Sequence, residues 1–307
     1  MLCNMSLIAR NRHFSALAVV LVVALLLSSC VIPDPSREAP PLLSYPPDYT
    51  PQVFVLYEPY PLTQAWLEGV VPVPSYHGWT DERMMRDLDR MREIGLQGLF
   101  LCLRLESLSD PFIIERISRF YDLIQSRFPA FRVGLVMTPT QKTTISRQNV
   151  VSYMRKHGIL DAECVFRLGG RPFLGFAEDI TLTDRPISDV SIRQWGNEWH
   201  VRPRNGDYDQ VSAHESFIWV CAGYSGTRRS IRRQDMAQWP QPRDKYGDFF
   251  RLGLRRAFAA GAAIVCIDSW NDFVAGSFIE PNSYDQDLML RVLREELVEV
   301  ARQRNRP

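Results

Sequence analysis

The chain has 307 residues, and 36 Lys and Arg stand against 35 Asp and Glu, which gives a formal net charge of +1. A near-neutral chain with mixed charges has no electrostatic footprint for nucleic acid, so a basic nucleic-acid-binding protein is excluded. The sequence has no C-x-x-C, H-x-H or H-E-x-x-H pattern. We therefore expect no metal site and no cofactor.

The N-terminal segment predicts export. Two arginines precede an uncharged run over residues 14–29, which ends in Leu-Ser-Ser and is followed by Cys30. A basic segment, a short apolar segment and small residues before a cleavage site are typical of a signal peptide. The ending resembles a bacterial lipobox, so residues 1–29 would be removed and Cys30 lipidated. A transmembrane anchor is the alternative, but it needs about 20 apolar residues and this run is shorter.

Lipidation of Cys30 predicts a protein of the bacterial cell envelope that is held to the membrane by its lipid. The residue after the cysteine is Val31 and not Asp. If the host is Gram-negative, this resembles the signal for sorting to the outer membrane. Removal of residues 1–29 takes away two Arg and no acid, so the net charge becomes −1. Proline recurs over residues 30–51, which predicts an extended, semi-rigid tether. Residues 52–307 then form one domain of a size typical of a barrel.

From residue 52 onward, strand-like and helix-like segments alternate. This alternation predicts a parallel sheet covered by helices, in the α/β class. The first helix is the best defined, because Thr80 or Asp81 is a good N-cap and Gly95 a good residue past its end. Apolar runs predict strands at 52–57, 98–103, 132–137, 172–176, 216–222 and from 264. Helical spacing predicts helices at 79–94, 111–126, 144–156, 246–260 and 284–302.

The alternation is interrupted between about 180 and 215. Residues 187–195 favour a short helix, residues 198–201 a strand, and Asn-Gly-Asp at 205–207 a turn. Two complete strand–helix units need more residues than this segment contains. We therefore expect an abbreviated or irregular part of the fold here.

Four cysteines remain in the globular part, each within or beside an apolar run. We expect buried structural thiols. One disulfide is the alternative, since an exported protein meets an oxidising compartment, but sequence cannot pair the four. They are Cys102, Cys164, Cys221 and Cys266.

The stretch 264–281 has the most specific pattern. An apolar, β-branched run breaks into Trp270, Asn271 and Asp272, which is typical of a strand that ends in a polar loop. In an α/β barrel, residues just past a strand's carboxyl end face the active site. A carboxylate and an amide beside an aromatic ring suit a sugar. The alternative is that Asn and Asp cap loop amides, and Glu280 is equally consistent with closing the loop.

This stretch resembles the last strand and loop of glycoside hydrolase family 99 and of the related WbsX-type domains of polysaccharide biosynthesis. The family pattern is Trp/Phe-Asn-Glu-Trp-x-Glu-Gly-x-x-Ile/Leu-Glu-Pro. The resemblance implies a (β/α)8 TIM-type barrel, abbreviated at about 180–215, over residues 52–307. Matching residues are Trp270, Asn271, Gly276, Ile279, Glu280 and Pro281.

Two departures affect the catalytic pair that the resemblance implies. Asp272 stands where the family has its first Glu, and Phe273 replaces the Trp that follows. Ala275 stands where endomannosidase-like members have their second Glu, the acid/base. Asp272 can serve as the base, but Ala275 cannot donate a proton. The acid would come from elsewhere on the rim, from Glu58, Glu106, Glu178, Asp268 or Glu280.

Together with the predicted lipidation of Cys30, the resemblance implies a lipid-anchored glycoside hydrolase-like protein that acts on a cell-surface or extracellular polysaccharide. An active enzyme would be endo-acting, with a mannosidase-like mechanism that uses Asp272. The alternative is a catalytically degenerate carbohydrate-binding barrel for polysaccharide binding, export or assembly. A role in glycan synthesis ranks last, because the sequence has no Gly-rich phosphate loop before a helix.

Further candidate substrate contacts lie just past other predicted strands. Ala222-Gly223-Tyr224 matches part of a segment of the family 99 pattern. For the remaining candidates, the alternative to a ligand contact is a role as a loop cap or in the core. The arginines at 228–233 predict a solvated loop, with contact to an anionic polysaccharide as the other interpretation. The candidate contacts are Tyr57, Glu58, Glu106, Glu178 and Tyr224, in addition to Trp270, Asn271 and Glu280.

Overall fold

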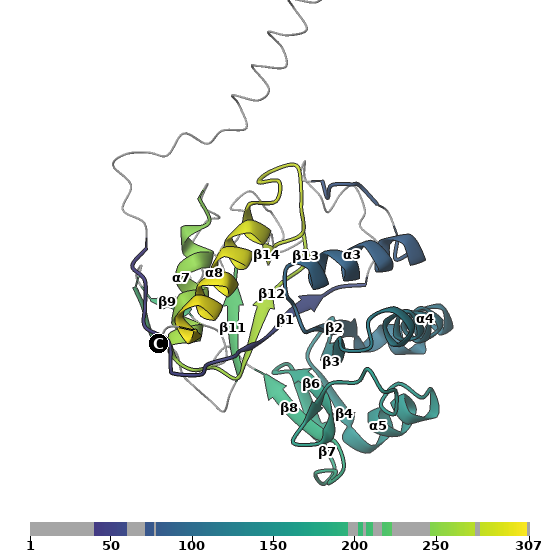
Figure 1. The fold of residues 1–307 in the computed structure, drawn as a ribbon. Coiled ribbons are helices and arrows are strands. Elements are labelled where there is room, and N and C mark those ends of the chain that lie inside the picture. Colours follow the sequence, from purple (N-terminus) through teal and green to yellow (C-terminus); the bar gives the residue numbers. More distant parts are fainter. Residues whose placement is uncertain are drawn as a thin grey trace, which may run out of the picture. The chain divides into compact units, whose positions relative to one another are not determined.

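The computed structural model describes residues 40–59, 71–76, 78–195, 202–204, 207–210, 217–222, 246–273 and 277–305. Its central feature is an eight-stranded sheet in the order β11-β12-β1-β2-β3-β6-β5, with β8 also paired to β6. Every pairing is parallel except that of β5 with β6. The sheet curls, and helices lie along its outer side (Figure 1). The predicted α/β class and abbreviated barrel are therefore confirmed.

The elements follow the predicted alternation closely. The sheet strands are β1 (Gln52–Tyr57), β2 (Gly98–Arg104), β3 (Arg132–Thr138), β5 (Arg167–Leu168), β6 (Arg171–Ala177), β8 (Ser191–Trp195), β11 (Phe217–Cys221) and β12 (Ile264–Asp268). The helices are α3 (Asp81–Glu93), α4 (Pro111–Arg127), α5 (Arg147–Lys156), α7 (Asp248–Ala259) and α8 (Leu288–Arg304), with a 3-10 turn η1 (Leu105–Ser109). Smaller pairs are β4 (Thr143–Ser146) with β7 (Ile180–Thr183), β9 (Arg202–Arg204) with β10 (Asp207–Gln210), and β13 (Asn271–Asp272) with β14 (Ser277–Phe278).

Side chains of the sheet separate into an inner and an outer layer. Along β1, Val53, Val55 and Tyr57 pack outward beneath α3 and α4, whereas Phe54 and Leu56 pack inward. The inner layer is closely packed by aromatic rings, so the barrel interior is a core and not a pore. Its main rings are Phe54, Phe100, Phe166, Phe173, Phe217 and Trp219.

Glycine makes room for this inner packing. A Cβ on Gly134 of β3 would lie only 2.3 Å from the ring of Phe100. The outer helices have the expected ends: Thr80 accepts a hydrogen bond from the Arg83 amide at 3.3 Å, and Gly95 has φ of 91° just past α3. The predicted N-cap and C-terminal glycine of α3 are both confirmed.

Two predictions in the middle of the chain were wrong. Residues 191–195 are not helical but form β8, because pairing with β6 outweighs the weak helical pattern of this short segment. The helix predicted from residue 144 begins at 147, because 143–146 pairs with β7 as β4. The strand predicted at 198–201 lies outside the described residues. Strands β9 and β10 pair antiparallel on either side of the predicted turn.

The predicted tether needs a correction at its C-terminal end. Residues 40–51 are extended but not free, because the chain here packs on α7 and α8. The Tyr49 hydroxyl donates to the Ala262 carbonyl at 2.6 Å, and Arg255 binds the carbonyls of Pro40 and Pro41. Apolar contact and these hydrogen bonds place the start of the folded unit at Pro40 instead of residue 52.

All four globular cysteines are buried thiols with no disulfide among them, which confirms the prediction of structural thiols. Within the described part of the chain, the structure contains no helix long and apolar enough to cross a membrane. Cys30 and the predicted signal peptide lie outside the described residues.

Candidate functional site

Three carboxylates gather at the carboxyl ends of the inner strands. Glu58 comes two residues after Leu56, and Asp268 two residues after Cys266, so both continue the inward-facing set. Asp272 follows in the β13–β14 hairpin. All three carboxylates are partly exposed. The charges of Asp272 and Asp268 raise the pKa of Glu58, and the charge of Asp272 raises the pKa of Asp268, so the three carboxylates lie near each other.

Serine side chains fix the loop that carries two of these acids. The Ser269 hydroxyl accepts a hydrogen bond from the Asp272 amide at 2.8 Å. The Ser277 hydroxyl donates to the Asp268 carbonyl at 2.7 Å and lies 3.4 Å from the Asp268 Oδ1 atom. The loop therefore returns on itself and holds both aspartates at the end of β12.

The third acid, Glu58, is held in place by Asn271, a residue far from it in sequence. Its side-chain Oδ1 accepts from the Glu58 amide at 2.8 Å, and its Nδ2 donates to the Glu58 carbonyl at 2.8 Å. Arg83 of α3 also reaches the Glu58 carbonyl, at 3.4 Å. Asn271 is only 2% exposed, so it positions Glu58 and does not face a ligand. Its predicted role as a direct sugar contact is corrected accordingly.

Burial and neighbouring charge favour a proton on this group of acids. Burial, followed by the charge of Asp272, raises the pKa of Glu58 well above its usual value, although Arg104 acts in the opposite direction. The same two causes raise the pKa of Asp268 to about 7. The protonated form of Glu58 is thus favoured beside Asp272, and a raised pKa is the property that a carboxylic acid needs to act as a general acid.

Comparison with known proteins identifies the architecture around this site. No protein-family model matches the chain, and no curated protein matches it. A solved GH99 endo-alpha-mannosidase of Bacteroides thetaiotaomicron is similar with a TM-score of 0.61 and 12% identity, over 82% of this chain and 98% of that chain. A solved glycoside hydrolase-like protein is similar with a TM-score of 0.54 and 13% identity, over 85% of this chain and 97% of that chain. The chain has the fold of glycoside hydrolase family 99.

Within this family 99-like barrel, two predicted contacts belong to the outer layer. The Tyr57 hydroxyl donates to Asp87 Oδ2 of α3 at 2.9 Å, and the Tyr57 side chain is fully buried. Glu280 is also fully buried, accepts from the Tyr76 hydroxyl at 2.6 Å and lies 3.7 Å from an Arg86 nitrogen. Strand alternation carries Tyr57 away from the mouth, so neither residue is placed to meet a sugar, contrary to expectation.

Trp270 was expected to form a sugar platform, but the structure places it in the core. Its side chain is fully buried in the outer-layer cluster, and its indole N–H has no hydrogen-bond partner among the described residues. Phe273 is buried as well and stacks on Phe278 with ring centroids 4.4 Å apart. Packing, not ligand contact, explains both aromatic residues.

The remaining candidates are dispersed. Glu106 is exposed in η1, and its Oε1 accepts from the Thr140 amide at 3.1 Å. Glu178 is exposed in the turn after β6. Tyr224, Ala275 and the arginines at 228–233 lie outside the described residues.

Sequence reasoning missed Arg104, the cation beside the acids. It follows inner-layer Cys102 by two residues, so it ends β2 on the inward side, and it is exposed. Strand alternation was the available signal. Among the described residues, no three His, Cys, Asp or Glu side chains are arranged to bind a metal ion.

Proposed function

We propose that this protein is a lipid-anchored glycoside hydrolase-like protein of the bacterial cell envelope, acting on a surface or extracellular polysaccharide. The observation that carries the proposal is the group of acids, Glu58, Asp268 and Asp272, at the carboxyl ends of the barrel strands. This end of a TIM-type barrel is where active sites occur. The family 99 fold supports a carbohydrate as the partner.

Glycoside cleavage generally needs one proton donor and one base or nucleophile. Glu58 is the donor in this proposal, because burial and the Asp272 charge favour its protonated form. Asp272 is the base and, as the family resemblance implies, acts on the 2-hydroxyl of the sugar itself. Glu58 thereby replaces the acid that Ala275 cannot provide. Asn271 and Arg83 are positioning residues that hold the Glu58 backbone.

The experiment is a panel of neutral and acidic polysaccharides assayed for new reducing ends. We expect wild-type cleavage of at least one polymer and a fall of about 10²–10⁴-fold in both Asp272→Asn and Glu58→Gln. Both variants keep the side-chain shape and should fold normally. Cleavage that is unaffected by either substitution would place the chemistry elsewhere.

A carbohydrate-binding barrel without catalysis is the second candidate, favoured by Ala275 at the family's acid/base position. In that case wild type and Asp272→Asn bind the same glycan equally, and neither cleaves it. Binding without cleavage across the panel would support this candidate over the hydrolase.

Anchoring is tested separately through Cys30. The Leu-Ser-Ser-Cys30 ending supports lipidation at this cysteine. Cys30→Ser should yield a protein that is unprocessed or no longer partitions with membranes as a mature, lipid-bearing species. Persistence of that species in the variant contradicts the lipidation proposal.

A further inference from the structure

A hollow of about 450 Å³ lies between α3 and α4, which are side by side (Figure 1). Its lining comes from residues 78–82, which lead into α3, from the first turns of α4 and from Pro59. Pro59 directly follows Glu58, the proposed proton donor. Segments that lead from a strand into its helix form the active-site face of a TIM-type barrel. The hollow therefore lies at the face that carries the group of acids.

Arg83 connects this hollow to the acids. Its Nη1 donates to the Gly78 carbonyl at 3.3 Å, and its Nη2 donates to the Glu58 carbonyl at 3.4 Å. Gly78 lines the hollow. Because one guanidinium reaches both carbonyls, the wall of the hollow and the backbone of Glu58 are close neighbours. A glycan chain bound at Glu58 can therefore extend into the hollow.

Apolar side chains give the hollow a surface for a sugar ring. Phe112 of α4 lines it and is 61% exposed, whereas every other Phe and Trp whose burial the structure describes is buried or partly buried. Trp79, Ile113 and Pro59 also line it. Ligand sites are typically concave and mostly apolar, with a few well-placed polar groups. The Phe112 ring is available to stack on a ligand.

Arg116 places a hydrogen-bond donor in the hollow. Its Nη2 donates to Asp81 Oδ1 at 2.7 Å, and because both residues line the hollow, this bond holds the guanidinium between the two walls. Its Nε is buried without a partner among the described residues, as is the indole N–H of Trp79. Buried polar groups are rarely left unpaired, because this costs free energy. A ligand with hydroxyl oxygens offers the acceptor that Arg116 Nε lacks.

Charges in and beside the hollow balance. Asp81 accepts from Arg119 Nε and from Arg116, each at 2.7 Å, and these two bonds lower the pKa of Asp81. A hydrogen bond with its own backbone amide, followed by one from Thr80, lowers the pKa of Glu82. Both acids are therefore ionised at neutral pH and match the two arginines in charge. With no excess charge, the hollow suits an uncharged ligand whose hydroxyls both donate and accept.

We infer that the hollow between α3 and α4 binds an uncharged sugar residue of a glycan that extends from the group of acids. The inference rests on the proposed function, because it takes a glycan as the partner of that site. Phe112 provides the ring face and Arg116 a donor. The carboxylates of Asp81 and Glu82 accept hydrogen bonds from sugar hydroxyls.

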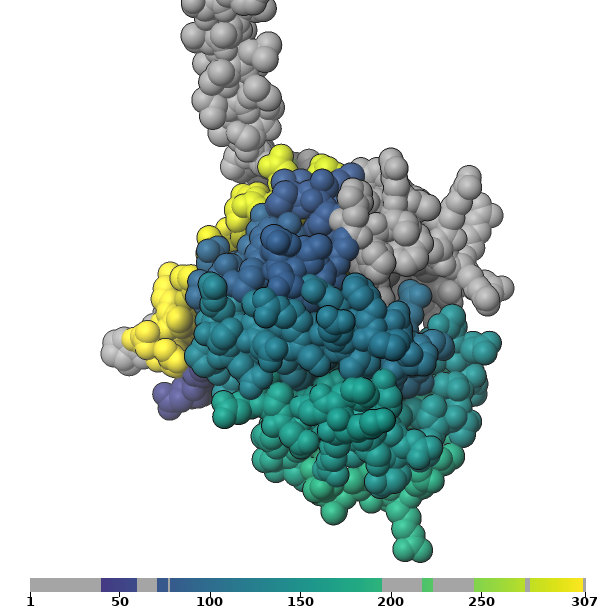
Figure 2. All heavy atoms as spheres, turned by 90° about the vertical axis from the view of Figure 1, so that its right-hand side faces the viewer, coloured from purple at the N-terminus to yellow at the C-terminus, as the bar shows by residue number. Residues whose placement is uncertain are grey.

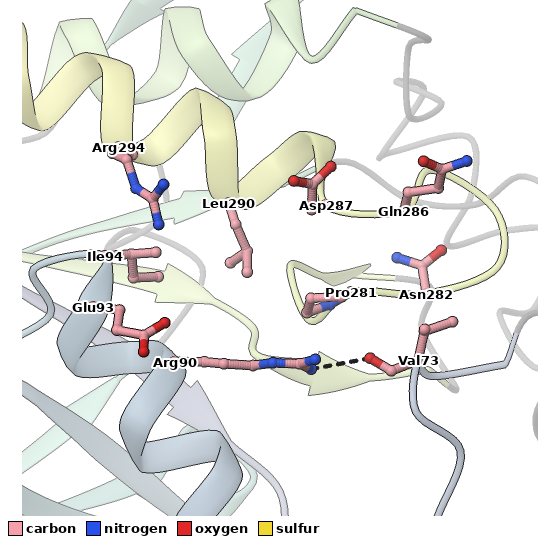
Figure 3. A pocket seen from close by; sticks show the side chains of 10 residues that line it. All are labelled: Val73, Arg90, Glu93, Ile94, Pro281, Asn282, Gln286, Asp287, Leu290 and Arg294. Carbon is pink, nitrogen blue, oxygen red and sulfur yellow. Dashed lines mark hydrogen bonds between the residues drawn. The ribbon is translucent and has the colours of Figure 1, made fainter. Parts of the chain in front are cut away.

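The larger hollow between α3 and α8 lacks these features. Figure 3 shows it, with Arg90 bonded to the Val73 carbonyl at 3.0 Å. Its volume is about 550 Å³, but none of the residues that line it is aromatic. None of them has a buried side-chain polar atom without a partner in the described part of the chain. Size alone therefore does not indicate a sugar site in this molecule.

The test is calorimetric titration of the Asp272→Asn protein, which keeps the shape of the site and should not consume the probe. The neutral probes are mannotetraose, cellotetraose and xylotetraose, and tetragalacturonate is the acidic probe. We expect saturable binding of at least one neutral tetrasaccharide and weaker binding of the acidic one. No saturable binding of any neutral probe, or tighter binding of tetragalacturonate than of every neutral probe, overturns the inference.

Variants in the same background locate the binding. Phe112→Ala should weaken tetrasaccharide affinity about three- to tenfold, the loss expected for one aromatic contact, whereas Phe112→Tyr keeps the ring and the affinity. Because Phe112 is exposed, its truncation should leave the fold intact. Tyr284→Ala is the matched control, since Tyr284 is 60% exposed, does not line the hollow and should not affect binding. Equal affinity of Phe112→Ala and Tyr284→Ala contradicts the site.

The result is independent of hydrolysis, because binding is measured without cleavage. Tetrasaccharide binding that depends on Phe112 supports the hollow even if the polysaccharide panel finds no cleavage. Cleavage in that panel, together with an affinity that Phe112→Ala leaves unchanged, overturns the hollow and leaves the proposed hydrolase standing.

Discussion

Two groups of charged residues lie on opposite sides of β1, and their environments differ sharply. The outer group, beneath α3, contains Arg83, Asp87 and Glu280, each at most 1% exposed and either hydrogen-bonded to a tyrosine or ion-paired with a charged neighbour. The inner group at the strand ends contains Glu58 and Asp272, both partly exposed. Both groups contain an Asp and a Glu. Burial and pairing, not residue identity, therefore separate a structural cluster from a candidate site.

Figure 2 views the molecule from the side of α3, α4 and α5, and the outer group, at most 1% exposed, lies beneath the surface of α3. Arg83 stacks on the Tyr76 ring with its guanidinium carbon 3.8 Å from the centroid and also reaches the Glu58 carbonyl. Through this bond of Arg83, the outer group also helps to hold the backbone of Glu58 in the candidate site. Four predictions test whether the two groups really divide into structure and function.

The largest expected loss of stability is at Trp270. Truncation of a fully buried Trp costs about 3–5 kcal/mol, so Trp270→Ala should lower the free energy of unfolding by that amount in urea titrations. Trp270→Phe keeps most of the packing and should cost much less. Normal stability of Trp270→Ala together with lost glycan binding would restore the sugar platform that the structure argues against.

Glu280 should behave as a structural acid. Glu280→Ala removes the acceptor of the Tyr76 hydroxyl and a partner of Arg86, and loss of one partner from a buried charged group costs about 3 kcal/mol or more. Asp272→Ala, at the partly exposed position, should cost about 1 kcal/mol or less. Urea denaturation of both variants measures the difference, and equal costs would remove the distinction between the two groups.

Asn271 connects the groups and should show a mixed effect. Asn271→Ala removes two hydrogen bonds to the Glu58 backbone, so stability should fall by about 1–3 kcal/mol. Cleavage of any substrate found in the polysaccharide panel should fall further than stability explains, because a 1 Å displacement costs about a hundredfold in rate. An active, fully stable Asn271→Ala protein would show that Glu58 needs no such support.

The smallest effect concerns Asp268. Burial and the charge of Asp272 raise its pKa to about 7, above the usual 3.8, so its protonated form is favoured in the folded state. The stabilisation is complete below about pH 4 and is lost as the pH rises through about 7. Asp268→Asn should then be more stable than wild type at pH 8 by about 1–2 kcal/mol, reduced for partial exposure, but not at pH 4. If the free energies of unfolding of the two proteins change with pH in parallel, Asp268 has an ordinary pKa.

The sequence predicted the periodic elements well but could not predict the two layers. Residues 53–57 of β1 are apolar on both faces, so periodicity does not indicate which face turns inward. Tyr57 and Glu58 were therefore treated alike, although they lie on opposite sides of the sheet. The partner of Asn271 is 213 residues away in sequence, which no local pattern reveals. Asp272, Glu58 and Asp268 were found because each lies at or just past the end of a strand.

The account depends most on the protonation of Glu58 beside Asp272. Carbon-13 NMR titration of the Glu58 carboxyl, assigned by comparison with Glu58→Gln, measures this without a substrate. The account predicts a pKa well above the usual 4.5 in wild type and a lower pKa in Asp272→Asn, because the neighbouring charge is then removed. A Glu58 pKa near 4.5 in both proteins would contradict its role as the proton donor.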